Sequence, residues 1–181
     1  MTKILLVDAN DRVVGKAEKA AAHQGLGQRH RAFSVLIVDN RGRMLIQQRS
    51  RLKPLWSLFW TNACCSHQAR AGNDTRQAKQ RLREELGFSV PLRFLFKLPY
   101  RRNYKHDRSE YEITYVFWGR YQGEVTPDSK EVADYRWVSL AQLQEEIADQ
   151  PDRFTPWFQK IIHKIHQDGK LRTQVWGQHG Q

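Results

Sequence analysis

Cysteine is scarce in this chain. The sequence has 181 residues and only two cysteines, Cys64 and Cys65, which are neighbours. Adjacent residues rarely reach disulfide geometry, so the chain lacks the covalent framework typical of small secreted proteins. Two such thiols are either packed in an apolar core or used for chemistry. The sequence leaves both alternatives open.

Long apolar runs are also absent. No segment approaches the ~18 apolar residues that cross a bilayer. Asp8 and Asp11 interrupt the first residues before the apolar core of a signal peptide could form. We therefore expect a cytoplasmic protein without a membrane partner. Hydrophobic residues still make up 40% of the chain, which is enough for a real core. We expect one domain over residues 1–181.

Acidic residues are few compared with basic ones. The chain has 30 Lys and Arg against 19 Asp and Glu, which gives a net charge of +11. The excess lies in two segments: residues 28–53 hold seven basic residues and one acidic residue, and residues 93–108 hold six and one. Such concentrated charge suits nucleic acid, an acidic membrane surface or a phosphorylated small molecule, or it only keeps the surface solvated.

The hydrophobic pattern predicts strands and helices without a regular βαβ alternation, which favours an α+β fold with a mixed sheet packed between helices. We expect an N-terminal hairpin extension and a loose tail over residues 170–181. The predicted elements are strands at Ile4–Val7, Val13–Val14, Phe33–Val38, Met44–Gln48, Leu92–Leu98, Tyr111–Tyr121 and Asp134–Val138, a short helix followed by a loop within Lys16–Gln28, helices at 73–86, 140–148 and from Pro156, and a basic loop at Arg101–Ser109.

Several residues suit a metal ion. Glu110 and Glu112 occupy alternating positions, which face the same side of a strand. With His23, His30 and His67 they would give a five- or six-coordinate site for Mn²⁺, Mg²⁺ or Zn²⁺. Histidines so far apart in sequence are more often unrelated, so spacing alone leaves this site open.

Other candidates concern anions and cations. Glu84 and Glu85 end the predicted helix, where they either face solvent or hold a divalent cation that carries a diphosphate. Three tryptophans belong to the core unless one presents its face to a cation. These tryptophans are Trp56, Trp60 and Trp157. Four basic residues suit phosphate, although each alone is an ordinary surface residue: Lys19, Arg49, Lys53 and Arg81.

Short segments stand out by their order and spacing: Glu18–His23, His30–Ser34, Trp60–His67, Arg83–Gly87, Tyr100–Arg101 and Glu110–Glu112. In these segments the chain resembles the type I isopentenyl-diphosphate Δ-isomerases, a branch of the Nudix superfamily. The resemblance runs from about Ile4 to Trp157. It implies a Nudix-like sheet between helices and an isomerase of isoprenoid biosynthesis that interconverts isopentenyl and dimethylallyl diphosphate.

The resemblance also implies residue roles. It makes Cys65 and Glu112 the acid–base pair that moves protons through a tertiary carbocation, with Tyr100 beside Glu112, and leaves Cys64 to packing. Which of the two is the acid in the forward direction stays open. The implied ligands of a Mn²⁺ site, or one for Mg²⁺ or Zn²⁺, are His23, His30, His67, Glu110 and Glu112.

The remaining implied roles concern the substrate, an isoprenoid diphosphate. Glu85 and the Cys65 carbonyl would hold a Mg²⁺ bound to the diphosphate, and Trp157 would face the developing carbocation. The implied phosphate contacts are Lys19, Arg49, Lys53 and Arg81. We expect a monomer without a nucleic-acid partner, since the basic segments lack the interleaved aromatic residues of a known nucleic-acid motif.

The chain departs from the full Nudix pattern. Counting back from Gly87, the Arg-Glu pair of that pattern falls on Gln80-Arg81 and its first glycine on Ser66. Loss of the pair argues against a Nudix hydrolase, which needs a carboxylate cluster for a metal-activated water. Ser66 also follows Cys65 where many isomerases have glycine, which could crowd the turn.

Overall fold

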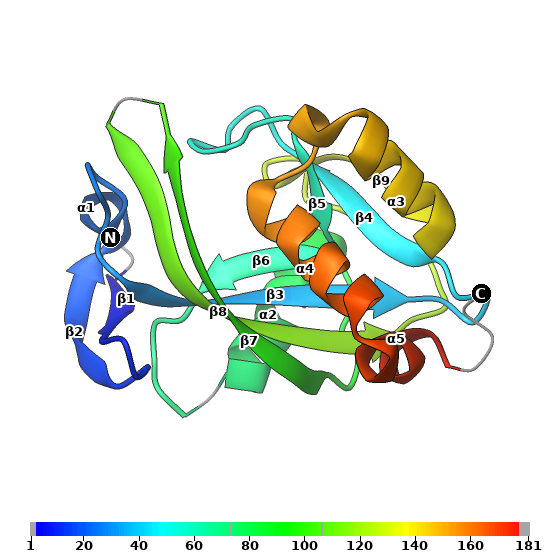
Figure 1. Cartoon of the computed structure of the whole chain (residues 1–181), viewed down its shortest axis with the longest axis horizontal. Coiled ribbons are helices and arrows are strands. Elements are labelled where there is room, and N and C mark those ends of the chain that lie inside the picture. The colour runs from blue at the N-terminus through cyan, green and yellow to red at the C-terminus, as the bar shows by residue number, and fades with distance from the viewer. Residues whose placement is uncertain (1–2, 73, 106, 178–181) are drawn as a thin grey trace.

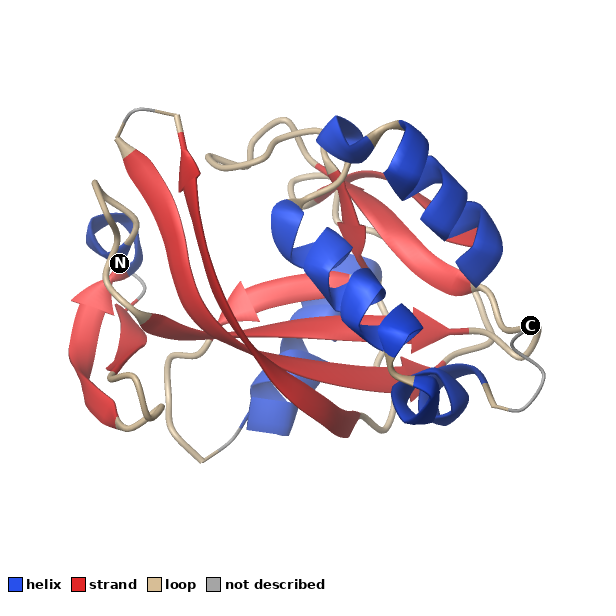
Figure 2. Cartoon of the chain, in the orientation of Figure 1, coloured by secondary structure: helices blue, strands red, loops and turns tan. Residues whose placement is uncertain are grey.

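The computed structural model describes residues 3–72, 74–105 and 107–177. It contains one nine-stranded sheet with helices on both faces (Figures 1 and 2), which confirms the predicted fold class. The strands are β1 (Lys3–Val7), β2 (Val13–Glu18), β3 (His30–Val38), β4 (Met44–Arg49), β5 (Trp60–Asn62), β6 (Cys64–His67), β7 (Arg93–Tyr104), β8 (Arg108–Arg120) and β9 (Val132–Val138). The helices are α1 (Lys19–Ala22), α2 (Asp74–Leu86), α3 (Leu140–Asp149), α4 (Pro156–Gln167) and α5 (Gly169–Trp176), with a 3-10 turn η1 (Pro151–Arg153).

Strand β3 is the centre of the sheet. It runs parallel to β8 and antiparallel to β4 and β6, and all of its side chains are buried. Alternate residues face opposite sides: Val35 packs in the cluster that contains α2, and Leu36 packs in the cluster that contains α4. Burial on both faces explains the apolar run Val35–Val38 at the end of this strand.

The two long predicted helices are confirmed. Helix α2 buries Ala78, Leu82 and Leu86, and Gly87 follows it at φ +81°, the left-handed conformation that favours glycine at a helix C-terminus. Residue 73 lies outside the described residues. Helix α4 begins at Pro156 and buries the apolar face that the sequence indicates. Helix α3 is capped by Ser139, whose hydroxyl accepts the Gln142 N–H at 3.2 Å.

The predicted basic loop at Arg101–Ser109 is wrong. Strand β7 continues to Tyr104 and β8 starts at Arg108, so most of the segment forms the end of a long hairpin (Figure 1). This end of β7 is exposed, and the cross-strand backbone bonds do not need apolar side chains there. Arg101 lies over the ring of its register partner Tyr111, at 4.8 Å from the ring centroid.

The predicted loose tail is also wrong where the structure describes it. Residues Gly169–Trp176 form α5, and Val175 and Trp176 are buried against the cluster that contains α4. The carboxylate of Asp168 accepts the Lys170 and Leu171 N–H groups and so caps the helix. A helix this short and polar has a weak sequence pattern, and residues 178–181 lie outside the described part. The sequence pattern also missed the short strands β5 and β6.

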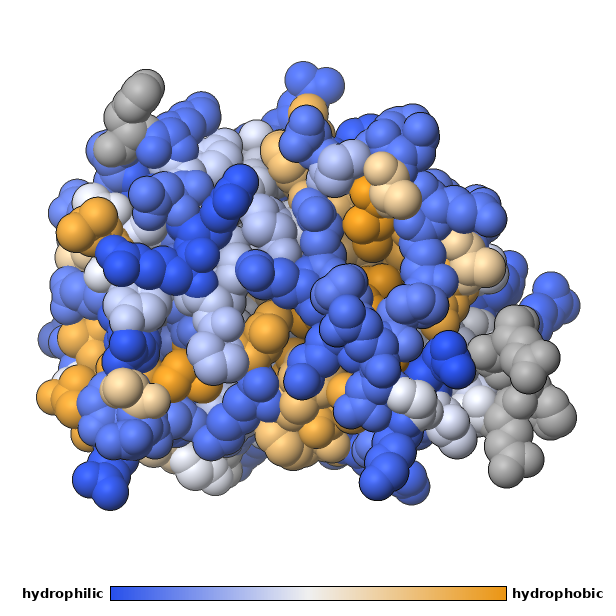
Figure 3. Space-filling view, viewed as in Figure 1, coloured by the Kyte–Doolittle hydropathy of each residue, from blue (hydrophilic) through white to orange (hydrophobic). Residues whose placement is uncertain are grey.

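The surface is mostly polar. On the face seen in Figure 3, hydrophobic residues show as separate groups among hydrophilic ones. In the parts of the chain that are described, every helix is too short or too polar to traverse a membrane.

Candidate functional site

Five side chains from four elements meet in one buried cluster, here called the His/Glu cluster. Its members are His23, just after α1, His30 at the start of β3, His67 at the end of β6, and Glu110 and Glu112 in β8. One ligand atom from each lies within 4.8 Å of all the others. The parallel pairing of β3 with β8 sets His30 opposite Glu112. The i, i+2 spacing places both carboxylates on one face, as predicted.

The backbone orients two of these histidines. Nδ1 of His23 lies 2.6 Å from the Lys19 carbonyl oxygen, and Nδ1 of His30 lies 2.7 Å from the Gln28 carbonyl oxygen. A carbonyl oxygen can only accept, so each Nδ1 carries a proton that it donates. Nε2 of each ring is then left to face the cluster. This arrangement is typical of histidine ligands of metal ions.

Inside the cluster, nitrogen and oxygen atoms crowd together. Nε2 of His23 lies 2.9 Å from Oε2 of Glu110 and 3.2 Å from Nε2 of His67. Nε2 of His67 lies 3.1 Å from Oε1 of Glu112. Buried Nε2 of His30 has no hydrogen-bond partner among the described residues. Buried polar atoms without partners are costly, and three imidazoles with two carboxylates suit a divalent metal ion. The cluster therefore fits such an ion.

The protonation of two members of the cluster also suits a metal ion. Burial acts to raise the pKa of Glu112, but the imidazoles of His30, whose Nε2 lies 3.5 Å from Oε1 of Glu112, and of His67 outweigh it and hold this pKa well below its usual value. Burial lowers the pKa of His67. Burial also acts to lower the pKa of His23, but the bond to Glu110 raises it overall. Glu112 is thus ionised and His67 neutral, the forms in which these residues bind metals.

The His/Glu cluster opens into a cavity of about 520 Å³. Cys65, Glu112 and Trp157 all line this cavity, as do Phe33 and Leu55, so the wall combines apolar surface with a few reactive groups.

The two cysteines face opposite sides of β6. Cys64 is fully buried in the cluster that contains α2, whereas Cys65 lines the cavity. Sγ of Cys65 lies 3.7 Å from Oδ1 of Asn62 and 3.8 Å from Oγ1 of Thr61. Burial raises the pKa of both thiols, so both carry a proton at neutral pH. Only Cys65 can present this proton to a molecule in the cavity.

Tyr100 and Trp157 lie close to the cavity. Tyr100 is the register partner of Glu112, and its ring centroid is 6.2 Å from that of Trp157. The Tyr100 hydroxyl is buried without a hydrogen-bond partner among the described residues. Burial, and then the charge of Glu112, raises the pKa of Tyr100, which keeps the phenol protonated. Trp157 itself lines the cavity.

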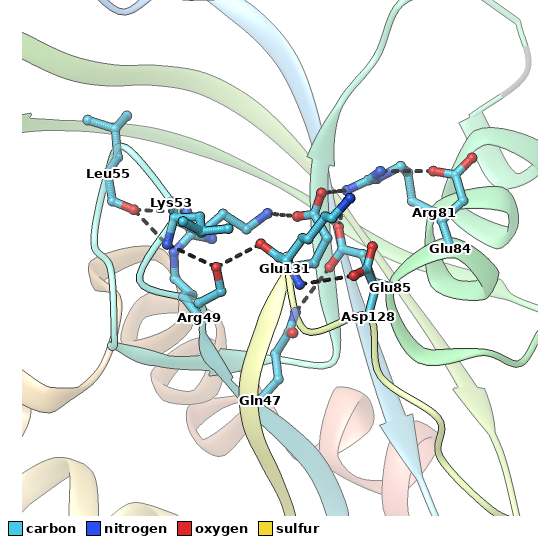
Figure 4. Close-up of polar contacts among 12 residues, drawn as sticks. Gln47, Arg49, Lys53, Leu55, Arg81, Glu84, Glu85, Asp128 and Glu131 are labelled. Atoms are coloured by element: carbon cyan, nitrogen blue, oxygen red, sulfur yellow. Dashed lines mark hydrogen bonds and ion pairs between the residues drawn. The ribbon is translucent and has the colours of Figure 1, made fainter.

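Four basic residues, here called the cation group, were predicted to bind phosphate: Lys19, Arg49, Lys53 and Arg81. The first three line the cavity, whereas Arg81 does not belong to its lining. Burial, and then the charge of Lys53, lowers the pKa of Lys19. Arg49 donates to the carbonyl oxygens of Leu55 at 2.9 Å and Trp56 at 3.0 Å, so it holds the loop that follows β4 (Figure 4).

Glu85 is held by two neighbours. One carboxylate oxygen accepts from Nη2 of Arg81 at 2.5 Å, and the other accepts from Nε2 of Gln47 at 3.2 Å. Arg81 also donates to Glu84 at 2.8 Å (Figure 4). Glu85 is 1% exposed, so the solvated helix end that the sequence allows applies only to Glu84.

Sequence reasoning missed Glu131, which lies just before β9. Its carboxylate pairs with Lys53 and lies 3.3 Å from Nη2 of Arg81 (Figure 4). No local motif surrounds this residue, because its partners meet it only in the folded chain. Gln47 was missed for the same reason.

Comparisons with known proteins point to one family. The model of the NUDIX domain matches residues 28–158. An isopentenyl-diphosphate Delta-isomerase of Burkholderia multivorans is 40% identical over 90% of this chain and 92% of that protein. An isopentenyl-diphosphate Delta-isomerase 2 of Photorhabdus laumondii is also 40% identical, over 90% of this chain and 91% of that protein.

Solved structures are similar in fold at low identity. The crystal structure of DR0079 from Deinococcus radiodurans has a TM-score of 0.73 at 16% identity, over 90% of this chain and 98% of that chain. The MutT protein from Methanosarcina mazei has a TM-score of 0.64 at 16% identity, over 78% of this chain and 96% of that one. These two likenesses concern the fold alone.

Proposed function

The chain belongs to the Nudix family and, within it, to the isopentenyl-diphosphate Delta-isomerases, and on that basis we propose that it interconverts isopentenyl diphosphate and dimethylallyl diphosphate. One observation of the structure supports this most: a protonated thiol, Cys65, and an ionised carboxylate, Glu112, line the same cavity as three basic residues. Proton donor, proton acceptor and anion contacts are thus available to a single small molecule.

The reaction moves a double bond by adding one proton and removing another. A proton adds to the terminal CH₂ of the alkene and leaves a tertiary carbocation on the neighbouring carbon. A different proton then leaves the CH₂ group on the other side of that carbon, and the electrons of its C–H bond form the new double bond. No electrons enter or leave overall, so the protein must supply one acid and one base.

Cys65 and Glu112 are the two groups that we assign to this task. Each acts as the acid in one direction of the reaction and as the base in the other. Tyr100, protonated and buried beside Glu112, would orient that carboxylate. Because an isolated alkene is a weak base, the two groups must be held in position while the carbocation exists.

The cavity wall protects the carbocation. The Trp157 ring lines the cavity, and its π face would be worth about 2 kcal/mol to a desolvated cation. Apolar side chains such as Phe33 and Leu55 exclude water that would otherwise trap the carbocation. The diphosphate is remote from the reacting carbons, and the energy of its binding to the cation group holds the alkene in this enclosure.

Two metal ions belong to the proposal. The His/Glu cluster would hold Mn²⁺, or Mg²⁺ or Zn²⁺, and such an ion would fix Glu112 and set its proton affinity. Glu85, with the Cys65 carbonyl, would hold a Mg²⁺ that neutralises part of the diphosphate charge. We further propose a monomeric cytoplasmic enzyme of isoprenoid biosynthesis, with this small molecule as its partner and neither nucleic acid nor a membrane.

NMR in D₂O tests the function directly. The reduced protein, supplied with Mg²⁺ and Mn²⁺, is given isopentenyl diphosphate. We expect dimethylallyl diphosphate with deuterium at the carbons that exchange protons. Release of monophosphate or inorganic phosphate would instead show a Nudix hydrolase. An unchanged substrate with folded, metal-loaded protein would contradict the proposal, and Ser66 beside Cys65 would be the first residue to replace by glycine.

A further inference from the structure

The carboxylate of Glu131 pairs with two cations that the diphosphate of the substrate is expected to contact. One oxygen of its carboxylate pairs with the Lys53 ammonium group, and the other lies 3.3 Å from Nη2 of Arg81 (Figure 4). The two cations differ in their other partners. Arg81 also binds Glu84 and Glu85, whereas Glu131 is the only ionic partner of Lys53 among the described residues.

The backbone, rather than the ion pair, places Glu131. Its N–H donates to the Asp128 carbonyl oxygen at 2.9 Å, and its own carbonyl oxygen accepts the Ser50 N–H at 3.0 Å. The Ser50 hydroxyl donates to the Lys130 carbonyl oxygen at 2.7 Å. These bonds join the segment before β9 to the loop that carries Lys53. Glu131 therefore stays beside Lys53 even when the two side chains separate.

The charges explain why such a partner is needed. Lys53, Arg49 and Arg81 each act to lower the pKa of Lys19, as neighbouring like charges do, and Glu110 acts against them. In the protein without substrate, the carboxylate of Glu131 offsets part of this repulsion. A bound diphosphate brings its own negative charge and takes over that role, and Glu131 would then repel it.

The side chains are also exposed enough to exchange partners. The Glu131 side chain is 26% exposed and the Lys53 side chain 19%. When it separates from Lys53, the Glu131 carboxylate can be hydrated, so the exchange leaves no unpaired charge buried in the core. The paired side chains of Arg81 and Glu85 offer no such release, because Glu85 is 1% exposed.

We propose that Glu131 is an internal counter-ion that pairs with Lys53 in the substrate-free protein and gives this lysine up to the diphosphate of the substrate. This inference rests on the proposed function, since it gives Glu131 a role toward that diphosphate. The exchange weakens diphosphate binding and therefore speeds release of the product, whose diphosphate is the same as that of the substrate.

Two other roles for Glu131 predict effects of opposite sign. If Glu131 only positioned Lys53, its removal would weaken diphosphate binding. If it were a ligand of the Mg²⁺ that accompanies the diphosphate, its removal would weaken Mg²⁺-dependent binding. Only a competing counter-ion predicts tighter binding after its removal.

The test uses Glu131→Gln and calorimetry with inorganic diphosphate in the presence of Mg²⁺. We expect about tenfold tighter binding than in the wild type, because the ligand no longer displaces a carboxylate. The rise in melting temperature on adding the same ligand should also be larger in the variant. The matched control is Glu146→Gln, which removes a carboxylate paired with Arg136 outside the cavity lining and should leave the affinity unchanged.

A second variant locates the competition. In a Lys53→Met background, Glu131→Gln should increase the affinity by much less than tenfold, because the contested cation is gone. Unchanged or weaker binding of diphosphate by Glu131→Gln overturns the inference. The isomerase assay on the wild type separates this inference from the proposed function. If the wild type is active but Glu131→Gln does not bind diphosphate more tightly, only the role of Glu131 is refuted. If the wild type is inactive, the proposed function is refuted, and the measured affinities still test the counter-ion role.

Discussion

The His/Glu cluster and three members of the cation group line the same cavity, but the protein treats the two groups differently. In the His/Glu cluster, nitrogen and oxygen atoms face one another, and Nε2 of His30 has no hydrogen-bond partner among the described residues. In the cation group, Arg49, Lys53 and Arg81 are each already bound to oxygen atoms of the protein. The first group fits a metal ion, whereas in the second group carboxylates of the protein already neutralise Lys53 and Arg81.

The difference follows from how long each ligand stays. A resident metal ion can be held by atoms that have no other use, since the unfavourable metal-free state is rarely populated. A substrate leaves in every cycle, so its site must also be stable when empty. Internal partners provide that stability and lower the affinity at the same time. Variants of each group can test this comparison.

The largest expected effect separates chemistry from binding. Cys65→Ala removes the thiol that we assign to proton transfer, and we expect kcat to fall on the order of 10²–10⁴-fold. Calorimetry should find nearly unchanged binding of Mg²⁺-diphosphate, because the cation group is intact. Cys64→Ala is the control: it should stay active and lose about 1 kcal/mol of stability, since Cys64 lies in the core beside α2. Normal turnover by Cys65→Ala would refute the assigned mechanism.

A ligand variant should affect only the His/Glu cluster. His30→Gln removes one imidazole from the centre of the cluster, and we expect metal affinity to fall by about 100-fold or more. Metal content after dialysis, measured by mass spectrometry, gives this readout without an activity assay. Binding of inorganic diphosphate should change by less than about twofold. His163→Gln, on the exposed side of α4, is the matched control. Full metal content in His30→Gln would contradict the fit of this cluster to a metal ion.

Within the cation group, one substitution should affect substrate binding and another should affect stability. Lys53→Met removes a cavity-lining cation, and we expect KM to rise about tenfold with a smaller change in kcat. Arg81→Met instead leaves Glu85 buried without its cation, and we expect stability to fall by about 1–3 kcal/mol, a value reduced for the partial exposure of Arg81. Denaturant unfolding and steady-state kinetics of both variants measure this contrast. A larger stability loss for Lys53→Met would reverse it.

Motifs of a known family, together with one short spacing, made the His/Glu cluster predictable. The i, i+2 spacing of Glu110 and Glu112 sets their common face, and motifs in a fixed order gave the histidines. Helix α4 was equally readable, since its buried face repeats at helical spacing. In each case the information is local, or is carried by motifs of a known family.

The rest depends on contacts between distant segments. Glu131 meets Lys53 across 78 positions of the chain, and nothing near either residue records this pairing. The parallel pairing of β3 with β8 likewise joins segments that are far apart in sequence. The exposed end of the β7–β8 hairpin carries the charged residues of a loop, because only its backbone takes part in the sheet. The motifs thus located the site, and the folded chain showed how its charges are balanced.

The smallest expected effect concerns salt. The cation group lies partly open to solvent, and at ~0.15 M salt charges are screened over about 8 Å. We expect KM for isopentenyl diphosphate to rise about threefold to fivefold between ~0.02 M and ~0.3 M salt, because counter-ions compete for the same cations. Metal content should stay constant over this range, since the His/Glu cluster is buried and its bonds to the ion are short. If metal content proved as sensitive to salt as KM, both groups would bind their ligands through solvent-exposed, screened charges. The proposed difference between the His/Glu cluster and the cation group would then be wrong.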